Sequence, residues 1–169
     1  MKRIILLFLL FLFFSCTMNV DDYIYKDQVW ELIGRELMTI EEVESFIENN
    51  IKYKSDMELY NKIEYFASPH EILTNKAGDC EDFVIIYLYL IYLVTGEKGV
   101  AIGVHNNDIN ENHLMCKVSF HDYFISPQYI KLNYTEIYNC VVIKTISFDN
   151  LMTKSTSNNT RSTNTIIYN

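Results

Sequence analysis

The chain has 169 residues, about the size of one domain, and its 49% apolar and 14% aromatic residues are enough to build a hydrophobic core. Its formal net charge of -8 argues against a nucleic-acid partner, because phosphate binding requires clustered Lys and Arg. With only five Gly and two Pro, the composition also argues against a repeat or linker protein.

The first fifteen residues have the layout of a secretory signal peptide. Lys2-Arg3 precedes an apolar run over 4–14, which is shorter than the roughly 20 residues that a membrane-spanning helix needs. Ser15-Cys16 follows, and a small residue before a cysteine resembles a bacterial lipoprotein signal, in which that cysteine is lipidated. The sequence predicts a signal peptide over 1–15 and an exported protein anchored to the membrane through Cys16. An uncleaved N-terminal anchor is the alternative.

Three cysteines remain once Cys16 is assigned to the lipid, and an odd number cannot all pair within one chain. Cys116 and Cys140 both fall in strand-like segments. They either form a disulfide or are small buried apolar side chains, and we favour the second interpretation. Cys80 is the cysteine that we expect to be free.

Helical patterns fill the first half of the predicted domain, which we place at residues 29–152 between a tether over 16–28 and a disordered tail over 153–169. Ser68-Pro69-His70-Glu71 has the spacing of a capping box and predicts a short helix ending near Asn75. Thr39 followed by Glu42 has the same spacing at the start of the helix expected at 41–51. The other helices are expected at 29–38, 41–51, 57–66 and 81–94. The last of these carries no charge after Asp82, which indicates a helix buried in the core.

Strand patterns follow, rich in β-branched and aromatic residues, at 100–105, 113–120, 123–125 and 140–146. The polar segment 106–112 reads as a loop and His121-Asp122 as a tight turn. Helices first and strands afterwards predict an α+β domain, in which a buried central helix starting at Cys80 packs on a small antiparallel sheet.

Cys80 stands where a nucleophile is expected. A helix N-terminus carries about half a positive charge and favours thiolate over thiol, although neighbouring acids oppose thiolate formation unless they are neutralised. A buried helix that begins at a cysteine, followed by strands that carry a histidine, is the layout of papain-like thiol enzymes.

Two segments resemble the bacterial transglutaminase-like cysteine peptidases. Residues 66–73 read Phe-Ala-Ser-Pro-His-Glu-Ile-Leu, and residues 77–82 read Ala-Gly-Asp-Cys-Glu-Asp. That family tends to show an aromatic, a small residue and Pro-x-Glu, then Gly-Asp-Cys-Glu-Asp, then a strand, a loop and a histidine that opens the next strand. The resemblance extends over roughly Trp30 to Ile146 and implies a papain/transglutaminase-like fold.

Carried over to this chain, the family pattern implies Cys80 as the nucleophile and His113 as general base and acid. Phe66 takes the aromatic position near the oxyanion site, where Trp is more usual. The family expects Asp or Asn as the third member, but Ser126 stands there, and a hydroxyl cannot offset the charge of an imidazolium. Asp122 lies in the turn with the wrong strand parity, and His105 is the rival base.

Calcium is the one cofactor that the resemblance suggests, because some members bind it at an acidic cluster like that of Asp79, Glu81 and Asp82. The alternative is that these acids only complement the helix dipole. No other cofactor is required.

The function expected from the sequence is an exported, lipid-anchored cysteine peptidase or amidase that cleaves peptide or isopeptide bonds through an acyl-enzyme on Cys80. Its partners are then a peptide or protein substrate and a membrane, reached through the N-terminal lipid. The alternative, motivated by Ser126, is a catalytically weak or inactive surface lipoprotein that acts as a binding module.

Overall fold

The structure is a computed structural model and describes residues 20–107, 110–121, 125–127 and 140–157. The predicted signal peptide, Cys16, Asp122 and the end of the predicted tail from residue 158 lie outside the described residues.

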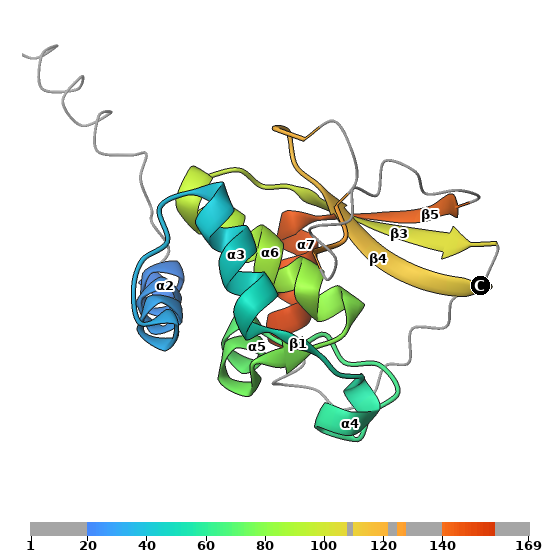
Figure 1. Cartoon of the computed structure of the whole chain (residues 1–169), viewed down its shortest axis with the longest axis horizontal. Helices are drawn as coiled ribbons and strands as arrows, with labels where there is room; N and C mark the ends of the chain where they lie inside the picture. The colour runs from blue at the N-terminus through green and yellow to red at the C-terminus, as the bar shows by residue number, and fades with distance from the viewer. Residues whose placement is uncertain (1–19, 108–109, 122–124, 128–139, 158–169) are drawn as a thin grey trace, which may run out of the picture.

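Helices build one side of the molecule and a small sheet builds the other (Figure 1). The helices are α2 (Val20–Ile33), α3 (Ile40–Asn50), α4 (Asp56–Tyr60), α5 (Pro69–Asn75), α6 (Cys80–Thr95) and α7 (Phe148–Ser157). The strands are β1 (Lys52–Tyr53), β2 (Ala77–Gly78), β3 (Val100–Asn106), β4 (Glu111–Lys117) and β5 (Cys140–Ser147). This mixed architecture with a small antiparallel sheet confirms the predicted α+β fold class.

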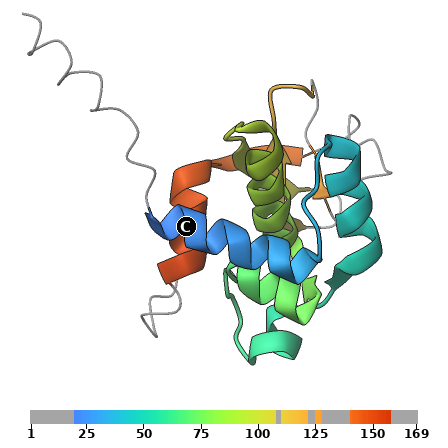
Figure 2. The ribbon, with the colours of Figure 1, turned by 90° about the vertical axis from the view of Figure 1, so that its left-hand side faces the viewer.

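Helix α6 is the centre of the core. Every residue from Glu81 to Ile91 is buried, because the helix is apolar on all sides and other elements surround it. Burial of each large apolar side chain contributes about 1.5–3 kcal/mol. Figure 2 shows α6 between α3 and α7, with α2 lying across the front of the helical layer. The helix ends at Gly96, whose φ of 77° is the left-handed cap that glycine favours.

The main sheet has the order β4-β3-β5, and both of its strand pairs are antiparallel. Cys116 lies opposite Ala101 on β3, whereas Cys140 lies opposite Asn106. Five residues of strand separate these levels by roughly 17 Å, far beyond the reach of a disulfide. None of Cys80, Cys116 and Cys140 forms a disulfide, so the disulfide alternative is wrong.

A second, two-stranded sheet determines where α6 begins. Strands β1 and β2 are parallel and pair Lys52 with Ala77 and Tyr53 with Gly78. The Lys54 N–H also donates to the Gly78 carbonyl at 3.0 Å. These bonds fix the backbone immediately before Asp79 and Cys80.

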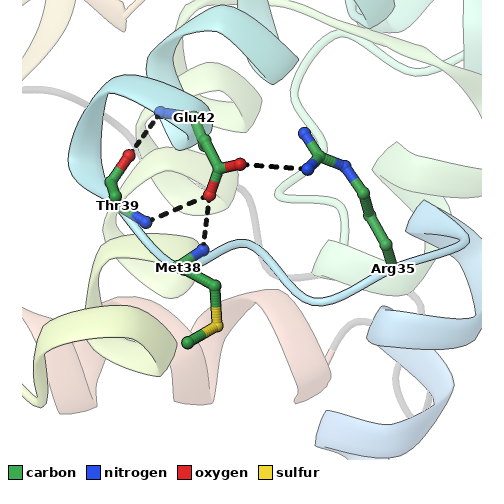
Figure 3. A network of polar contacts seen from close by, with 4 residues as sticks. All are labelled: Arg35, Met38, Thr39 and Glu42. Carbon is green, nitrogen blue, oxygen red and sulfur yellow. Dashed lines mark hydrogen bonds and ion pairs between the residues drawn. The ribbon is translucent and has the colours of Figure 1, made fainter.

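Capping boxes start three of the helices. Thr39 pairs with Glu42 at α3 and Ser68 with Glu71 at α5, as their spacing predicted, and Ser55 pairs with Glu58 at α4. Glu42 also accepts from the Met38 N–H at 2.7 Å and contacts the Arg35 guanidinium at 3.0 Å (Figure 3). The carboxylate therefore fixes the connection between α2 and α3.

Two helices differ from their predicted bounds at the N-terminal side of the domain. Helix α2 begins at Val20, inside the predicted tether, and stops at Ile33 because Gly34 adopts a φ of 80°. The helix predicted over 57–66 ends at Tyr60, because Asn61 takes a left-handed conformation. Ile63, which follows the end of the helix, is 91% exposed.

Helix α7 was not predicted, and it extends to Ser157, five residues into the segment expected to be a tail. Phe148, Leu151 and Ser155 are buried at helical spacing, and α7 packs against α6. Three buried positions on an otherwise polar helix are too weak a pattern to recognise in the sequence.

Candidate active site

Cys80 is the first residue of α6, and Asp79 is the N-cap residue before it. Gly78 is required at the approach, because a Cβ added there would lie 2.4 Å from Cβ of Asp82 one turn into the helix. The Asp79 side chain makes no N-cap hydrogen bond, and its carboxylate hydrogen-bonds with the Glu81 side chain instead. The thiol is therefore held at the helix start by a tight backbone approach.

The Cys80 thiol donates a hydrogen bond to Oε2 of Glu81 at 3.1 Å. Burial raises the pKa of Cys80, and the negative charge of Glu81 raises it further. A hydrogen bond from the Leu114 backbone on β4 lowers the pKa of Cys80, but it is a smaller effect than burial. The thiolate expected from the helix dipole alone is thus opposed by the neighbouring acid.

His113 lies on β4 with its Nε2 atom 2.9 Å from Oγ of Ser126. Ser126 is 2% exposed and follows Ile125, which pairs with Cys116 through two 2.8 Å backbone hydrogen bonds. With Nε2 directed at Ser126, Nδ1 is the nitrogen that can take a proton from a thiol. Burial lowers the pKa of His113 below its usual value, which favours the neutral imidazole that a general base requires.

Cys80 lies against the backbone of Leu114, the residue after His113, and no direct hydrogen bond joins the Cys80 and His113 side chains. Among the described residues, the thiol bonds to Glu81 and the imidazole to Ser126. Strand alternation places His113 on the same face of β4 as Met115, while Leu114 packs toward α6. The structure thus places Cys80 beside the part of β4 that carries His113, while the two side chains bond to different partners.

The remaining predicted residues are also placed. His105, the rival base, has its Nδ1 atom 2.9 Å from Asn112 Oδ1. On β3, His105 is two residues from Gly103, the residue that pairs with Leu114, which is a distance of roughly 7 Å along the strand. Phe66 is buried, and its neighbour Ala67 donates its N–H to Asp82 Oδ1 at 3.0 Å. This bond attaches the Phe66 segment to the start of α6.

Acidic side chains surround the start of α6 in two overlapping groups. One contains Asp79, Cys80 and Glu81, and the other contains Asp56, Asp79 and Asp82, with potential ligand atoms within 4.8 Å of one another in each group. Burial, together with hydrogen bonding and charge from Asp79, raises the pKa of Glu81 to about 10. Burial, with the charge of Asp79, also raises the pKa of Asp82 to about 8 and that of Asp56 to about 7. Negative charge is therefore disfavoured throughout this cluster.

The family model for the transglutaminase-like domain matches residues 32–157. The chain belongs to the transglutaminase-like domain family. This confirms the resemblance inferred from the two motifs around Phe66 and Cys80. Family membership, together with a cysteine at the start of the central helix, supports a cysteine-peptidase-like enzyme.

Solved structures agree with this fold. The transglutaminase-like domain is similar to Legionella pneumophila LapG with a TM-score of 0.51 and 20% sequence identity, over 63% of this chain and 61% of that chain. An EGTA-treated structure of the same protein matches with a TM-score of 0.49 and 21% identity over the same shares. The chain thus spans about three fifths of the length of LapG. No curated protein matches it.

Asp56 is the site residue that sequence reasoning missed. It occupies the first turn of α4, where an acid is ordinary helix chemistry, and it precedes Asp79 by more than twenty residues. Its relation to the site depends on the pairing of β1 with β2, and two-residue strands leave no periodic pattern in a sequence.

The cluster fits a hard cation. Oδ1 of Asp56, Oδ1 of Asp79 and Oδ2 of Asp82 are buried and make no hydrogen bond among the described residues. Unpaired buried carboxylate oxygens are costly, and carboxylate oxygens are the ligands that calcium prefers.

Proposed function

We propose that this protein is an exported, lipid-anchored cysteine peptidase or amidase that cleaves peptide or isopeptide bonds through Cys80. The observation that carries the proposal is the position of Cys80 at the first turn of the buried helix α6, beside the strand that bears His113. A domain of this kind acts on a protein or peptide, and cleavage at a carbonyl is the chemistry that a thiol and an imidazole perform together.

In the proposed reaction, Nδ1 of His113 takes the Cys80 proton and the thiolate attacks the substrate carbonyl carbon. The C–S bond forms, the C–N bond breaks, and the imidazolium gives its proton to the departing amine. Water then attacks the thioester with His113 again as base, which releases a carboxylic acid and restores the thiol. Side-chain contacts at ligand-free sites are often long and tighten when substrate binds, which is the movement that His113 requires here.

We further propose that Asp79, Glu81 and Asp82 hold a calcium ion. When bound, the ion supplies positive charge beside three acids that otherwise disfavour a thiolate. The residues themselves contribute the oxygen ligands, and the unpaired oxygens of Asp79 and Asp82 support this assignment.

The second candidate function is a binding module that keeps the fold without turnover. Ser126 favours it, because a hydroxyl orients His113 but does not offset its positive charge. The raised pKa of Cys80 favours it as well.

Alkylation of the folded protein near neutral pH, in the presence of calcium, distinguishes the two functions. We expect Cys80 to react faster than Cys140, which is also partly exposed, and much faster than the fully buried Cys116. Peptide hydrolysis should disappear in Cys80→Ala and in His113→Ala. Equal reactivity of Cys80 and Cys140 would sink the enzyme proposal, and activity that survives in either variant would sink the residue assignment.

Export and anchoring rest on the N-terminal sequence. None of the helices that the structure describes between residues 20 and 157 has the length and apolar content needed to cross a membrane. The full chain expressed in a bacterium should incorporate labelled fatty acid and sediment with membranes, and Cys16→Ala should abolish the labelling. A wild-type chain that takes up no label contradicts the lipid anchor.

A further inference from the structure

Asp56 and Asp79 occupy equivalent places at the ends of two paired strands. Strand β1 leads through Lys54 and Ser55 into Asp56, and strand β2 leads directly into Asp79. Because β1 and β2 are parallel, their carboxyl ends lie at the same edge of the small sheet. The start of α4 is thereby brought to the start of α6.

Each carboxylate of this edge uses one oxygen in the protein and leaves another unpaired. Asp56 is 2% exposed, and its Oδ2 accepts the Tyr65 N–H, while Oδ1 has no partner. Asp82 is 0% exposed, and its Oδ1 accepts the Ala67 N–H, while Oδ2 has no partner. Asp56 and Asp82 both belong to the group that converges with Asp79.

No side-chain cation of the described residues neutralises this group. The ion pairs of the described residues join Arg35 to Glu42, Lys98 to Asp149 and His121 to Glu44. Lys62 is the nearby base, but its Nζ atom lies 3.6 Å from the centre of the Tyr65 ring. Two buried acids and the half-buried Asp79, with no ion-pair partner among the described residues, constitute a site for an external cation.

We infer that Asp56 is a ligand of the proposed calcium ion, and that the ion joins the segment over residues 54–67 to the start of α6. Two of the carboxylates that would hold the ion, those of Asp56 and Asp82, also accept the N–H groups of Tyr65 and Ala67. These two residues flank Phe66, the aromatic residue beside the predicted oxyanion site. Bound calcium would therefore fix the backbone position of the residues on both sides of Phe66. The inference rests on the proposed calcium site and is independent of peptidase activity.

Binding is tested with the full chain in Asp56→Asn, which keeps the size of the side chain and an acceptor for the Tyr65 N–H. Terbium serves as a luminescent probe for calcium, since Tyr60 and Tyr65 lie near enough to feel the charges of Asp56 and Asp82 and can sensitise its emission. We expect Asp56→Asn to weaken terbium and calcium binding at least about tenfold. Glu64→Gln removes an equal charge that acts on Asp56 and Glu81 from a side chain that is not among the converging acids, so it should weaken binding clearly less than Asp56→Asn does.

Limited trypsin digestion tests whether calcium restricts the motion of the segment over residues 54–67, because Lys54 and Lys62 are exposed cleavage sites within it. Calcium should slow cleavage at Lys62 in wild type and in Glu64→Gln, and it should have no such effect in Asp56→Asn. The wild-type digest alone is informative if Asp56→Asn fails to fold, since cleavage unaffected by saturating calcium would overturn the inference.

The possible failures are distinguishable. Wild-type affinity and protection in Asp56→Asn, with binding lost in Asp79→Asn, would remove Asp56 from the site and leave the calcium proposal standing. A wild-type chain that binds neither terbium nor calcium would remove both. Failure of the peptidase proposal is seen separately, in the reactivity of Cys80.

Discussion

His113 and Ser126 form a pair in which the serine can orient the imidazole and cannot stabilise its charged form. The 2.9 Å contact and the burial of Ser126 hold the ring with Nε2 directed at Ser126. A carboxylate in the same place would also raise the pKa of the imidazole. The choice of serine therefore keeps His113 neutral at lower pH than an aspartate would.

Replacement of Ser126 separates orientation from charge. We expect Ser126→Ala to lower kcat by about tenfold or more, as is typical when the group that orients a reacting imidazole is removed. Ser126→Asp should move the acid limb of the kcat/KM pH profile upward, since the carboxylate stabilises the imidazolium. In wild type this limb should lie below pH about 6.5, the usual pKa of histidine, because burial lowers the pKa of His113. An unchanged kcat in Ser126→Ala and an unchanged limb in Ser126→Asp would show that His113 and Ser126 do not act together.

At the scale of elements, the position of the site depends on the pairing of β2, the strand that immediately precedes α6, with β1. Strand β2 is only two residues long, yet its pairing with β1 fixes Gly78 against Asp82 and brings α4 to the same edge. Helix α4 stops early for a related reason. The Tyr65 N–H donates to the Asp56 side chain, so it does not form the backbone hydrogen bond that a helix over residues 62–66 would need.

Gly78→Ala tests this packing. The added methyl would meet buried side-chain atoms at 2.4–2.9 Å, and Asp82 cannot move without losing its bond to Ala67. We expect a loss of about 1–3 kcal/mol in the free energy of unfolding, measured by urea denaturation. Gly103→Ala is the matched control, because its nearest contacts would be at 3.5 Å, and it should change stability by less than about 1 kcal/mol. Equal effects of the two substitutions would contradict a close approach at Gly78.

For the whole molecule, the acidic cluster makes stability depend on pH. Burial raises the pKa of Asp56 to about 7 and that of Asp82 to about 8, whereas an unfolded Asp titrates near pH 4. Between these values the folded state binds more protons than the unfolded state. The free energy of unfolding therefore decreases as pH rises from about 4 to about 8.

Thermal unfolding of the chelator-treated chain should thus give a lower midpoint at pH 8 than at pH 5, by about 2–4 °C for each kcal/mol lost. Saturating calcium should reduce this difference, because a cation that binds the folded state stabilises it. A midpoint that rises steadily from pH 5 to pH 8 without calcium would contradict the assigned burial of these carboxyl groups.

Local features of the sequence were sufficient to predict the central helix, the capping boxes at Thr39 and Ser68, the α+β class and the family. Charge-free runs, cap spacing and the Gly-Asp-Cys-Glu-Asp motif act over a few residues and can be recognised without knowledge of the rest of the chain. Cys80 was expected at the start of α6 for the same reason, and the structure begins that helix there.

Contacts between distant segments required the folded chain. Asp56 reaches Asp79 and Asp82 only because two very short strands pair, and helix α7 forms because three buried residues pack on α6. The first view of Cys80 as a dipole-favoured thiolate changed for this reason as well. The helix dipole and the adjacent acids Asp79 and Glu81 are local properties, whereas the burial that raises the pKa of Cys80 most comes from tertiary packing.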